Sequence, residues 1–242
     1  MVIRETASTQ DLARERGPTA GDVVAAWRQT GGRGRLGRRW SDTGEEGVAV
    51  TFVVEAPAPE LLAAILAVAA CEAVESVLQA GSPRPGIKWP NDLWVDGRKL
   101  AGILVEQQGA LAACGIGVNV RQRSFEPGLA TRATSLAMMS PHTAPDRLEV
   151  LVALVGAVDR WLGRAPEEIC AAYAARDLLR GARARLQGPE GAREGTVEAV
   201  DPLRGIRIRD DAGVLHHLPA ATTSVEWFRG RGGAGTQAAR PT

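Results

Sequence analysis

Residues 59–79 carry apolar side chains at helical spacing, and neither glycine nor proline follows Pro59 within the segment. This periodicity predicts a helix and is the strongest secondary-structure signal in the chain. A β-branched segment at 47–54 and largely apolar segments at 100–107 and 111–120 lie on either side of it and predict strands. A long helix among such strands indicates one large domain of mixed helices and strands, so we expect an α+β fold.

Capping and turn signals define other elements of the first 180 residues. A helix is predicted to begin at Ser8, whose hydroxyl can cap a first turn that contains Asp11. Asp96-Gly97 between two apolar runs predicts a hairpin turn. We expect a strand at 23–27, an irregular loop at 30–47, and helices at 146–162 and 166–178.

The pattern changes near Gly181, after which glycine, charged residues and short Val/Ile alternations dominate. Four short strands, at 183–186, 195–200, 206–208 and 214–218, predict a small β-barrel. Such a piece buries little surface alone and is expected to pack on the first domain. We therefore predict a large mixed domain at 1–180, a small β domain at 181–228 and a disordered tail at 229–242.

Composition excludes several classes of function. The net charge of +1 disfavours a general nucleic-acid binder or a membrane-surface protein. Cys71, Cys114 and Cys170 stand singly in apolar runs, which predicts buried free thiols in a reducing compartment. No export signal opens the chain, and the longest apolar run, 61–71, is too short to span a bilayer. We expect a cytoplasmic protein without a membrane partner.

The chain uses arginine almost throughout and keeps lysine only as Lys88 and Lys99, eleven residues apart. The two residue types differ where a compact charge must reach a polyanion or a reacting carboxylate. In one interpretation Lys88 places its ammonium on a reacting oxyanion, while Asn91 or Asp92 orients it or holds a divalent cation. In the other, Asn91 and Asp92 only form a turn, and Lys99 is a solvated hairpin residue.

A second segment, from Gln29 to Trp40, alternates glycine with arginine. Glycine lets the backbone approach a ligand, arginine offers planar donors to phosphate or carboxylate, and Trp40 can stack on a base. The arginines from Arg28 to Arg39 have no acidic residue among them and would repel one another unless an anion lay between them. The segment lacks the Lys-Ser/Thr of a P-loop. The alternative is an exposed Arg/Gly loop that binds RNA, or nothing.

A third segment contains Gly115-Ile116-Gly117 and Asn119 on a predicted strand. A lone Gly-x-Gly is weak evidence, and tight packing of a central strand explains it equally well. Asn119 can reach a ribose or a phosphate in the functional interpretation. The 3 histidines are too few and badly placed for a metal centre or a Ser-His-Asp system. An anionic substrate activated by a nucleotide therefore fits better than a hydrolase.

Five runs occur in the order and at the separation typical of one family: Ser8-Thr9-Gln10 and residues 32–40, 88–93, 99–106 and 115–120. On these runs the chain resembles biotin–protein ligases, up to about residue 227. The combination of the Gly-Arg run with Lys-Trp-Pro-Asn-Asp-Leu is highly specific. The resemblance implies a mixed-sheet catalytic domain of the class II aminoacyl-tRNA-synthetase-like, biotin–lipoate ligase fold, followed by a small SH3-like β-barrel.

The resemblance implies a two-step, AMP-forming ligase. Biotin carboxylate attacks the α-phosphate of ATP, with Mg²⁺, and gives biotinyl-5′-AMP and pyrophosphate. A lysine of a biotin carboxyl carrier protein domain then attacks the mixed anhydride, and AMP leaves. Lys88 and Arg35 are the implied catalytic residues, and Lys88 matches the lysine that bridges the biotin carboxylate and the α-phosphate.

The resemblance also implies two sets of binding residues. Those for biotin are Ser8, Thr9, Gln10, Gln29, Arg33, Gly34, Arg35 and Lys88. Those for ATP or the adenylate are Arg33, Arg35, Arg38, Trp40, Asn91, Lys99, Gly117 and Asn119. Mg²⁺ is expected near Asn91 and Asp92. Because the intermediate is labile in water, we expect the Arg/Gly segment to fold over it.

The chain departs from the family pattern at its start. Many bacterial members begin with a DNA-binding helix-turn-helix domain, for which Ser8 leaves no room, so we expect the ligase-only form and no DNA partner. The strand before Ser8 is shortened, and Gln10 stands where members often have Asn. A lipoate–protein ligase of the same fold and, more distantly, an RNA-binding module are the alternative functions. A homodimer is a further expectation.

Overall fold

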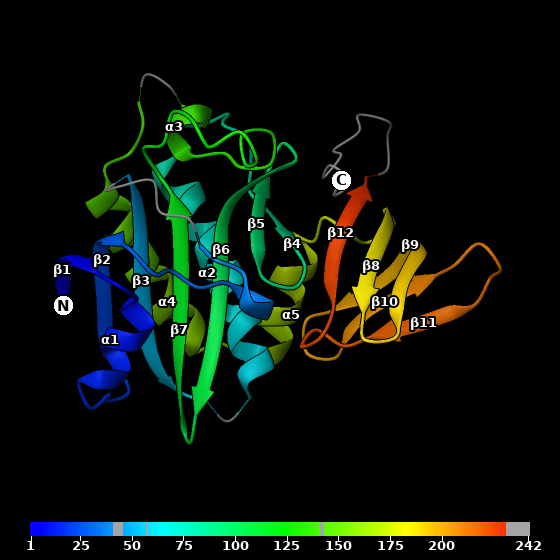
Figure 1. The fold of residues 1–242 in the computed structure, drawn as a ribbon, viewed down its shortest axis with the longest axis horizontal. Coiled ribbons are helices and arrows are strands. Elements are labelled where there is room, and N and C mark those ends of the chain that lie inside the picture. Colours follow the sequence, from blue (N-terminus) through cyan, green and yellow to red (C-terminus); the bar gives the residue numbers. More distant parts are fainter. Residues whose placement is uncertain (41–45, 57, 141–142, 231–242) are drawn as a thin grey trace.

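The computed structural model describes residues 1–40, 46–56, 58–140 and 143–230 (Figure 1). Its centre is a seven-stranded sheet with the order β1-β2-β3-β7-β6-β5-β4. β1 and β2 run parallel, and the other neighbouring pairs are antiparallel. The strands are β1 (Val2–Thr6), β2 (Val23–Gln29), β3 (Gly47–Glu55), β4 (Gly86–Lys88), β5 (Asp92–Val95), β6 (Arg98–Gln108) and β7 (Leu111–Asn119).

Helices cover both faces of this sheet, as the mixed α+β prediction requires. In Figure 1, α1 lies in front of the sheet, and α2, α4 and α5 lie behind it. Along β3, Val53 joins a small cluster beneath α1, whereas Phe52 and Val54 join the main core, because strand side chains alternate between faces. The helices are α1 (Thr9–Glu15), α2 (Pro59–Val77), α3 (Leu136–Met139), α4 (Arg147–Leu162) and α5 (Pro166–Ala174).

Local signals place the first helix and the central hairpin where the sequence predicts them. The Ser8 hydroxyl accepts a hydrogen bond from Asp11 N at 3.4 Å and so caps α1. Asp96 and Gly97 have φ values of 46° and 76°, the left-handed pair that turns β5 into β6. This hairpin brings β6 to the middle of the sheet, beside β7.

Three predicted helix boundaries were wrong, and the first is the end of α2, which stops at Val77 and not at residue 79. Asp146 is not helical; it is the N-cap of α4 and forms a capping box there. The next helix ends at Ala174, because the residues that follow pair with β4 instead. Ile87 N donates to Arg176 O at 2.7 Å, and Leu178 N donates to Ile87 O at 3.0 Å. The chain therefore enters its C-terminal part along the free edge of β4.

A second, antiparallel sheet follows in the order β11-β10-β9-β8-β12 and is called here the C-terminal module. It is consistent with the expected SH3-like domain, and its apolar residues belong to the same core cluster as the larger sheet. The sequence predicted four strands and missed β12, which lies nearest the larger sheet in Figure 1. The strands are β8 (Arg183–Gly188), β9 (Gly191–Asp201), β10 (Gly205–Arg209), β11 (Leu215–Leu218) and β12 (Ser224–Arg229). Of the predicted tail, residues 231–242 lie outside the described residues.

The three cysteines are free thiols, two of them buried and Cys170 partly so. Burial raises the pKa of Cys71 and of Cys114 to about 12, so neither is a thiolate at neutral pH. None of the described helices combines the length and the apolar character needed to cross a membrane.

Gly205 is a position at which the C-terminal module does not accommodate a side chain. It has a φ of 133°, and a Cβ there would lie 2.3 Å from Leu218 O. We expect Gly205→Ala to cost more than about 2 kcal/mol of unfolding free energy, since left-handed backbone alone costs roughly 1–2 kcal/mol. Gly213→Ala is the matched control, because Gly213 has a φ of 83° but open space around it. Denaturant unfolding measures the unfolding free energy of both variants. Equal losses of stability in the two variants would refute a steric clash at residue 205.

Candidate active site

The segment after β2 crosses the central strands on the front face of the seven-stranded sheet (Figure 1). Residues of this segment and of the strands beneath it line a pocket. Residues of α1, of this crossing segment, of the β4–β5 turn, of β6 and β7, and of β12 line it. It brings together nearly all the predicted site residues: Ser8, Thr9, Gln10, Gln29, Arg33, Gly34, Arg35, Arg38, Trp40, Lys88, Asn91, Asp92, Lys99 and Gly117. Asn119 is the exception.

Asn119 has a structural position at the end of β7. Its side chain is buried and outside the described pocket lining. Its Nδ2 donates to Thr134 O at 3.0 Å, and its Oδ1 accepts from Gln122 Nε2 at 3.5 Å. These bonds tie the chain after β7 to the end of that strand. The geometry therefore gives no support to a contact between Asn119 and a ribose or a phosphate.

The Arg/Gly loop, residues 30–40, folds back on itself above the sheet. Gly34 N donates to Arg38 O at 2.7 Å, and Trp40 N donates to Gly32 O at 3.0 Å. At the tip, Leu36 and Gly37 adopt φ values of 56° and 73°. Residues 33–36 and 38–40 of this hairpin line the pocket, while Leu36, Arg38 and Arg39 are also exposed to solvent.

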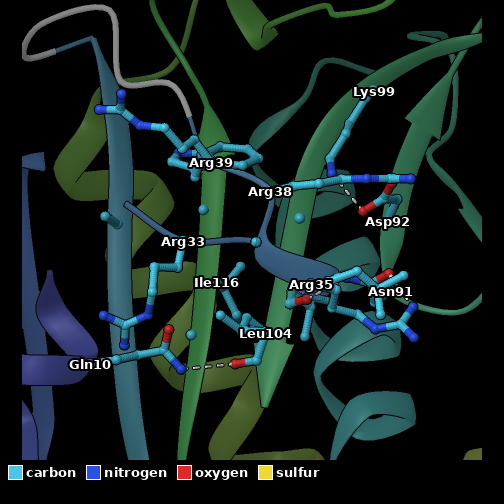
Figure 2. Close-up of a pocket in the computed structure, with 18 of the residues that line it drawn as sticks. Gln10, Arg33, Arg35, Arg38, Arg39, Asn91, Asp92, Lys99, Leu104 and Ile116 are labelled. Atoms are coloured by element: carbon cyan, nitrogen blue, oxygen red, sulfur yellow. Dashed lines mark hydrogen bonds and ion pairs between the residues drawn. The ribbon is translucent and has the colours of Figure 1, made fainter. Parts of the chain in front are cut away.

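Arg33 belongs to an ion-pair cluster with Asp11, Arg14 and Glu106. Both of its terminal nitrogens bond the Asp11 carboxylate, and Nη2 also lies 3.0 Å from Glu106 Oε2. Arg14 contacts the same two carboxylates, at 3.1 and 2.6 Å. Hydrogen bonding to Arg33 holds the pKa of Asp11 below its usual value. The negative charge that the sequence led us to expect near these arginines is supplied, for Arg33, by Asp11 of α1 and Glu106 of β6. Figure 2 shows the Arg33 side chain extended toward Gln10.

Arg35 reaches instead toward the C-terminal module. Its Nη1 donates to Asn91 Oδ1 at 3.3 Å, and its Nη2 donates to Ala220 O and, at 3.4 Å, to Ala221 O. These acceptors are all neutral, and burial lowers the pKa of Arg35 from its usual value. Bonds from a guanidinium to neutral groups are weaker than those to anions. An anionic ligand can therefore replace the carbonyl partners of Arg35.

Two glycines form a flat floor beneath the loop. Gly102 on β6 pairs directly with Gly117 on β7. A Cβ at Gly117 would lie 2.7 Å from Trp40 Cε2, and one at Gly102 would lie 3.1 Å from Lys99 Nζ. The Trp40 indole consequently lies on the bare backbone, with Lys99 Nζ 5.5 Å from its ring centroid. Close packing explains the Gly-x-Gly, and this packing keeps an aromatic ring within the pocket.

The opposite end of the floor is neutral and polar. Gln10 is buried, and its Nε2 donates to Leu104 O at 3.2 Å (Figure 2) and to Ala113 O at 3.0 Å. Gly115 makes room for this side chain, since a Cβ there would lie 3.1 Å from Gln10 Cδ. Both donor bonds use the amide nitrogen. The amide oxygen of Gln10 is thus oriented as an acceptor for a ligand.

A hydrogen-bonded chain of side chains supports this neutral end. Thr51 Oγ1 donates to Thr9 Oγ1 at 2.8 Å. Gln29 Oε1 then accepts from Thr9 Oγ1 at 3.0 Å and from Thr9 N at 2.8 Å. Thr51 is fully buried on β3, so the chain of bonds starts from a rigid strand. The Thr9 and Gln29 side chains are therefore fixed before any ligand arrives.

The two lysines have different environments. Lys99 Nζ lies 2.6 Å from Asp92 Oδ1, and 33% of the Lys99 side chain is exposed. Lys88 is only 8% exposed, and its Nζ donates to Val225 O at 3.3 Å. Burial lowers the pKa of Lys88 to about 8. Both lysines line the pocket, Lys99 with a partly exposed side chain and Lys88 with a buried one.

Positive charge dominates the pocket. Its described lining includes six cationic side chains and one carboxylate, that of Asp92. A cleft lined by one sign of charge concentrates ligands of the other sign. The described residues contain no cluster of three or more His, Cys, Asp or Glu side chains that would hold a metal alone. Mg²⁺ in nucleotide sites needs only one or two carboxylates besides the phosphates, and Asp92 beside Asn91 fits that requirement.

Comparison with known proteins agrees with this geometry. The family model described as the Biotin/lipoate A/B protein ligase family matches residues 2–121. The biotin–[acetyl-CoA-carboxylase] ligase of Mycobacterium tuberculosis is 34% identical over 205 residues, which cover 78% of this chain and 75% of that protein. The ligase of the same name from Paracoccus denitrificans is 36% identical over 204 residues, which cover 79% and 82%.

A solved structure extends the likeness to the whole fold. The biotin protein ligase from Aquifex aeolicus in complex with biotin and ATP superposes with a TM-score of 0.83 at 28% identity. The match covers 93% of this chain and 97% of that one, so it includes the C-terminal module. Fold and pocket together define the ligase class that the sequence motifs predict. The chain belongs to the biotin/lipoate A/B protein ligase family.

We expect Asp11→Asn to loosen the Arg/Gly loop, because Arg33 loses its bidentate carboxylate. Hydrogen exchange of the amides of residues 31–40 should then accelerate several-fold. Glu5→Gln is the control, since it breaks the 2.9 Å pair with Arg28 outside the pocket.

Arg33 lowers the pKa of Asp11 below 3.8, so in the wild type the carboxylate holds the loop above that pH. Its effect is lost as the pH falls through the lowered pKa. Unaltered exchange in Asp11→Asn would show that the cluster does not order the loop.

Proposed function

We propose that this protein activates biotin with ATP and transfers it to a lysine of a biotin carboxyl carrier protein domain. In the first step the biotin carboxylate attacks the α-phosphate, and pyrophosphate leaves. In the second, the carrier lysine attacks the mixed anhydride, loses a proton and forms an amide, and AMP leaves. The observation that carries the proposal is one pocket with a neutral amide end at Gln10 and a cationic, aromatic end at Trp40 and Lys99.

The neutral end fits the ureido ring of biotin, which has two N–H donors and one carbonyl acceptor. Gln10 fixes its amide nitrogen on the carbonyls of Leu104 and Ala113, which leaves the amide oxygen to accept from a ureido N–H. Gln at this position therefore retains the amide that Asn provides in many members, and its longer side chain reaches across to β6 and β7. Ser8, Thr9 and Gln29 complete the polar surface.

The cationic end fits the triphosphate and the adenine. Arg35 and Arg38 approach from the loop, Lys99 from β6, and Trp40 offers a ring face to the base. Two anions must come within reacting distance, and fixed positive charge reduces their repulsion. In this proposal Arg33 positions the loop and leaves the phosphates to the other cations, because two carboxylates already neutralise it.

In this proposal Lys88 takes the bridging position between carboxylate and α-phosphate that the family resemblance implies. Lys88 and Lys99 both line the pocket, and Lys99 adds a second cation for the phosphates. Asp92, which pairs with Lys99, and Asn91 would hold Mg²⁺ together with the phosphates. When bound, Mg²⁺ neutralises charge that develops on the phosphate oxygens.

The second step requires that water be kept from the intermediate. The folded Arg/Gly loop lies over the floor strands, and Arg35 joins it to the C-terminal module, which closes that side of the pocket. The partner in this proposal is the carrier domain of a biotin-dependent carboxylase, in the cytoplasm. Homodimer formation and the lack of a DNA partner stay predictions.

Exchange of labelled pyrophosphate into ATP, with biotin, lipoate or octanoate as the acid, tests the proposal. We expect exchange with biotin and a loss of about 100-fold or more in Lys88→Met, the scale for removing one group that stabilises developing charge. Arg98→Met is the control, because it also removes a cation of the central hairpin and Arg98 is absent from the described lining. Exchange with lipoate alone would instead support the lipoate ligases.

Folded protein that exchanges with no acid would refute the proposed reaction. RNA that stays bound to such inactive protein at high salt would favour the RNA-binding alternative.

Two alanine substitutions on β7 should separate the ends of the pocket. Gly117→Ala places a Cβ 2.7 Å from Trp40 Cε2, so we expect the KM for ATP to rise. The rise should be roughly tenfold, with the KM for biotin little changed. Gly115→Ala places its Cβ 3.1 Å from Gln10 Cδ and should raise the KM for biotin instead. The exchange assay gives both constants, and a common rise in both variants would contradict separate subsites.

A further inference from the structure

The C-terminal module contributes one polar side chain to the described lining of the pocket, and neither the sequence motifs nor the proposed reaction uses it. Ser224 and Val225, the first two residues of β12, line the pocket together with residues of the catalytic sheet. Side chains of a strand alternate between its two faces. Val225 packs in the apolar core, so the Ser224 hydroxyl lies on the other face of β12, directed away from that core.

The Ser224 hydroxyl is available to a ligand, and the backbone that carries it is fixed. Ser224 is partly buried, and its hydroxyl makes no hydrogen bond within the described residues. Its main chain pairs with Gln187 of β8, and the next carbonyl, Val225 O, accepts from Lys88 Nζ at 3.3 Å. A donor that is placed before the ligand arrives needs no reorganisation when it binds. Ser224 therefore offers a preoriented hydroxyl close to Lys88.

The layout of the pocket indicates which part of ATP lies against this hydroxyl. Gly115 and Gly117, which make room for Gln10 and Trp40, both belong to β7. The biotin and adenine ends of the proposed site therefore lie over the middle of the sheet. The sheet continues from β7 through β6 and β5 to β4, and the bond from Lys88 joins the end of β4 to β12. The remaining side of the pocket is thus formed by β4, β5 and β12.

The terminal phosphates of ATP are the ligand groups left for that side. Asn91 and Asp92, the residues proposed to hold Mg²⁺, stand in the β4–β5 turn and line the pocket there. Mg²⁺ in nucleotide sites is bound by one or two carboxylates together with the phosphates of the substrate. Phosphates that share Mg²⁺ with Asp92 would face β12. A serine hydroxyl can donate to a phosphate oxygen without adding a further positive charge to the pocket.

We propose that the Ser224 hydroxyl donates a hydrogen bond to the terminal phosphates of ATP, which leave as pyrophosphate. The C-terminal module thereby contacts the part of the nucleotide that is not retained in biotinyl-5′-AMP. The assignment rests on the proposed function, and it separates the two steps of the reaction. Ser224 contributes to the adenylation step, whereas the transfer step, from which pyrophosphate is absent, does not involve it.

Ser224→Ala, Ser224→Thr and the control Thr222→Ala test the assignment. Thr222 is exposed and absent from the described lining, so its variant removes a hydroxyl from the same segment outside the pocket. In pyrophosphate exchange, Ser224→Ala should raise the KM for ATP and the KM for pyrophosphate by about tenfold, the scale of one hydrogen bond to a charged group. Transfer from added biotinyl-5′-AMP to the carrier domain should keep its wild-type rate. Ser224→Thr keeps a hydroxyl and should recover much of the affinity, and Thr222→Ala should match the wild type.

Wild-type KM values for ATP and pyrophosphate in Ser224→Ala would overturn the assignment. An equal loss in exchange and in transfer would also overturn it, because the substitution would then disturb the pocket as a whole or a ligand group common to both steps. If the wild type does not catalyse exchange, the proposed function fails. Titration calorimetry with magnesium pyrophosphate then still tests the contact: weaker binding to Ser224→Ala than to the wild type supports it, and equal binding refutes it.

Discussion

The pairing of Gly102 with Gly117 is the constraint on which the pocket depends. Two neighbouring strands without side chains at this point leave a bare strip of backbone in the centre of a sheet whose opposite face is covered by helices. Trp40 and Lys99 lie directly on that strip, and Gly115 admits Gln10 further along the same strand. Because β6 and β7 are held in register by a long ladder, the two ends of the pocket have a fixed separation. A side chain at either glycine would lift the aromatic ring.

Above this floor, the distribution of charge matters more than its amount. The arginines of the Arg/Gly loop look equivalent in composition, yet carboxylates neutralise Arg33 while Arg35 bonds only neutral acceptors. The first arrangement fixes the loop on α1 and β6, and the second leaves a full charge for a ligand. Groups oriented before the reaction need no reorganisation when charge develops, which is the larger part of electrostatic catalysis. The same loop therefore combines a structural cation with a ligand-binding cation.

Much of the fold was predictable because its signals are local. Ser8 caps α1, and Asp96-Gly97 turns β5 into β6, each within a few residues of sequence. Most of the candidate site was predictable for the same reason, since its residues occur in short contiguous runs. The partners of Arg33 were not, because Asp11 and Glu106 lie 22 and 73 residues away. β12 was missed where its register shift interrupts the alternation of side chains.

The two lysines show most clearly what sequence leaves open. Both stand in the same motif segment, and both are rare in an arginine-rich chain, so pattern alone ranks Lys88 and Lys99 equally. Burial separates them: one ammonium is accessible at the floor of the pocket, and the other is enclosed by aromatic rings between two sheets. An enclosed charge is costly where no opposite charge offsets the loss of water. Because both lysines line the pocket, an anionic ligand would offset that cost for Lys88, so the two rare lysines are consistent with two compact cations at one anion site.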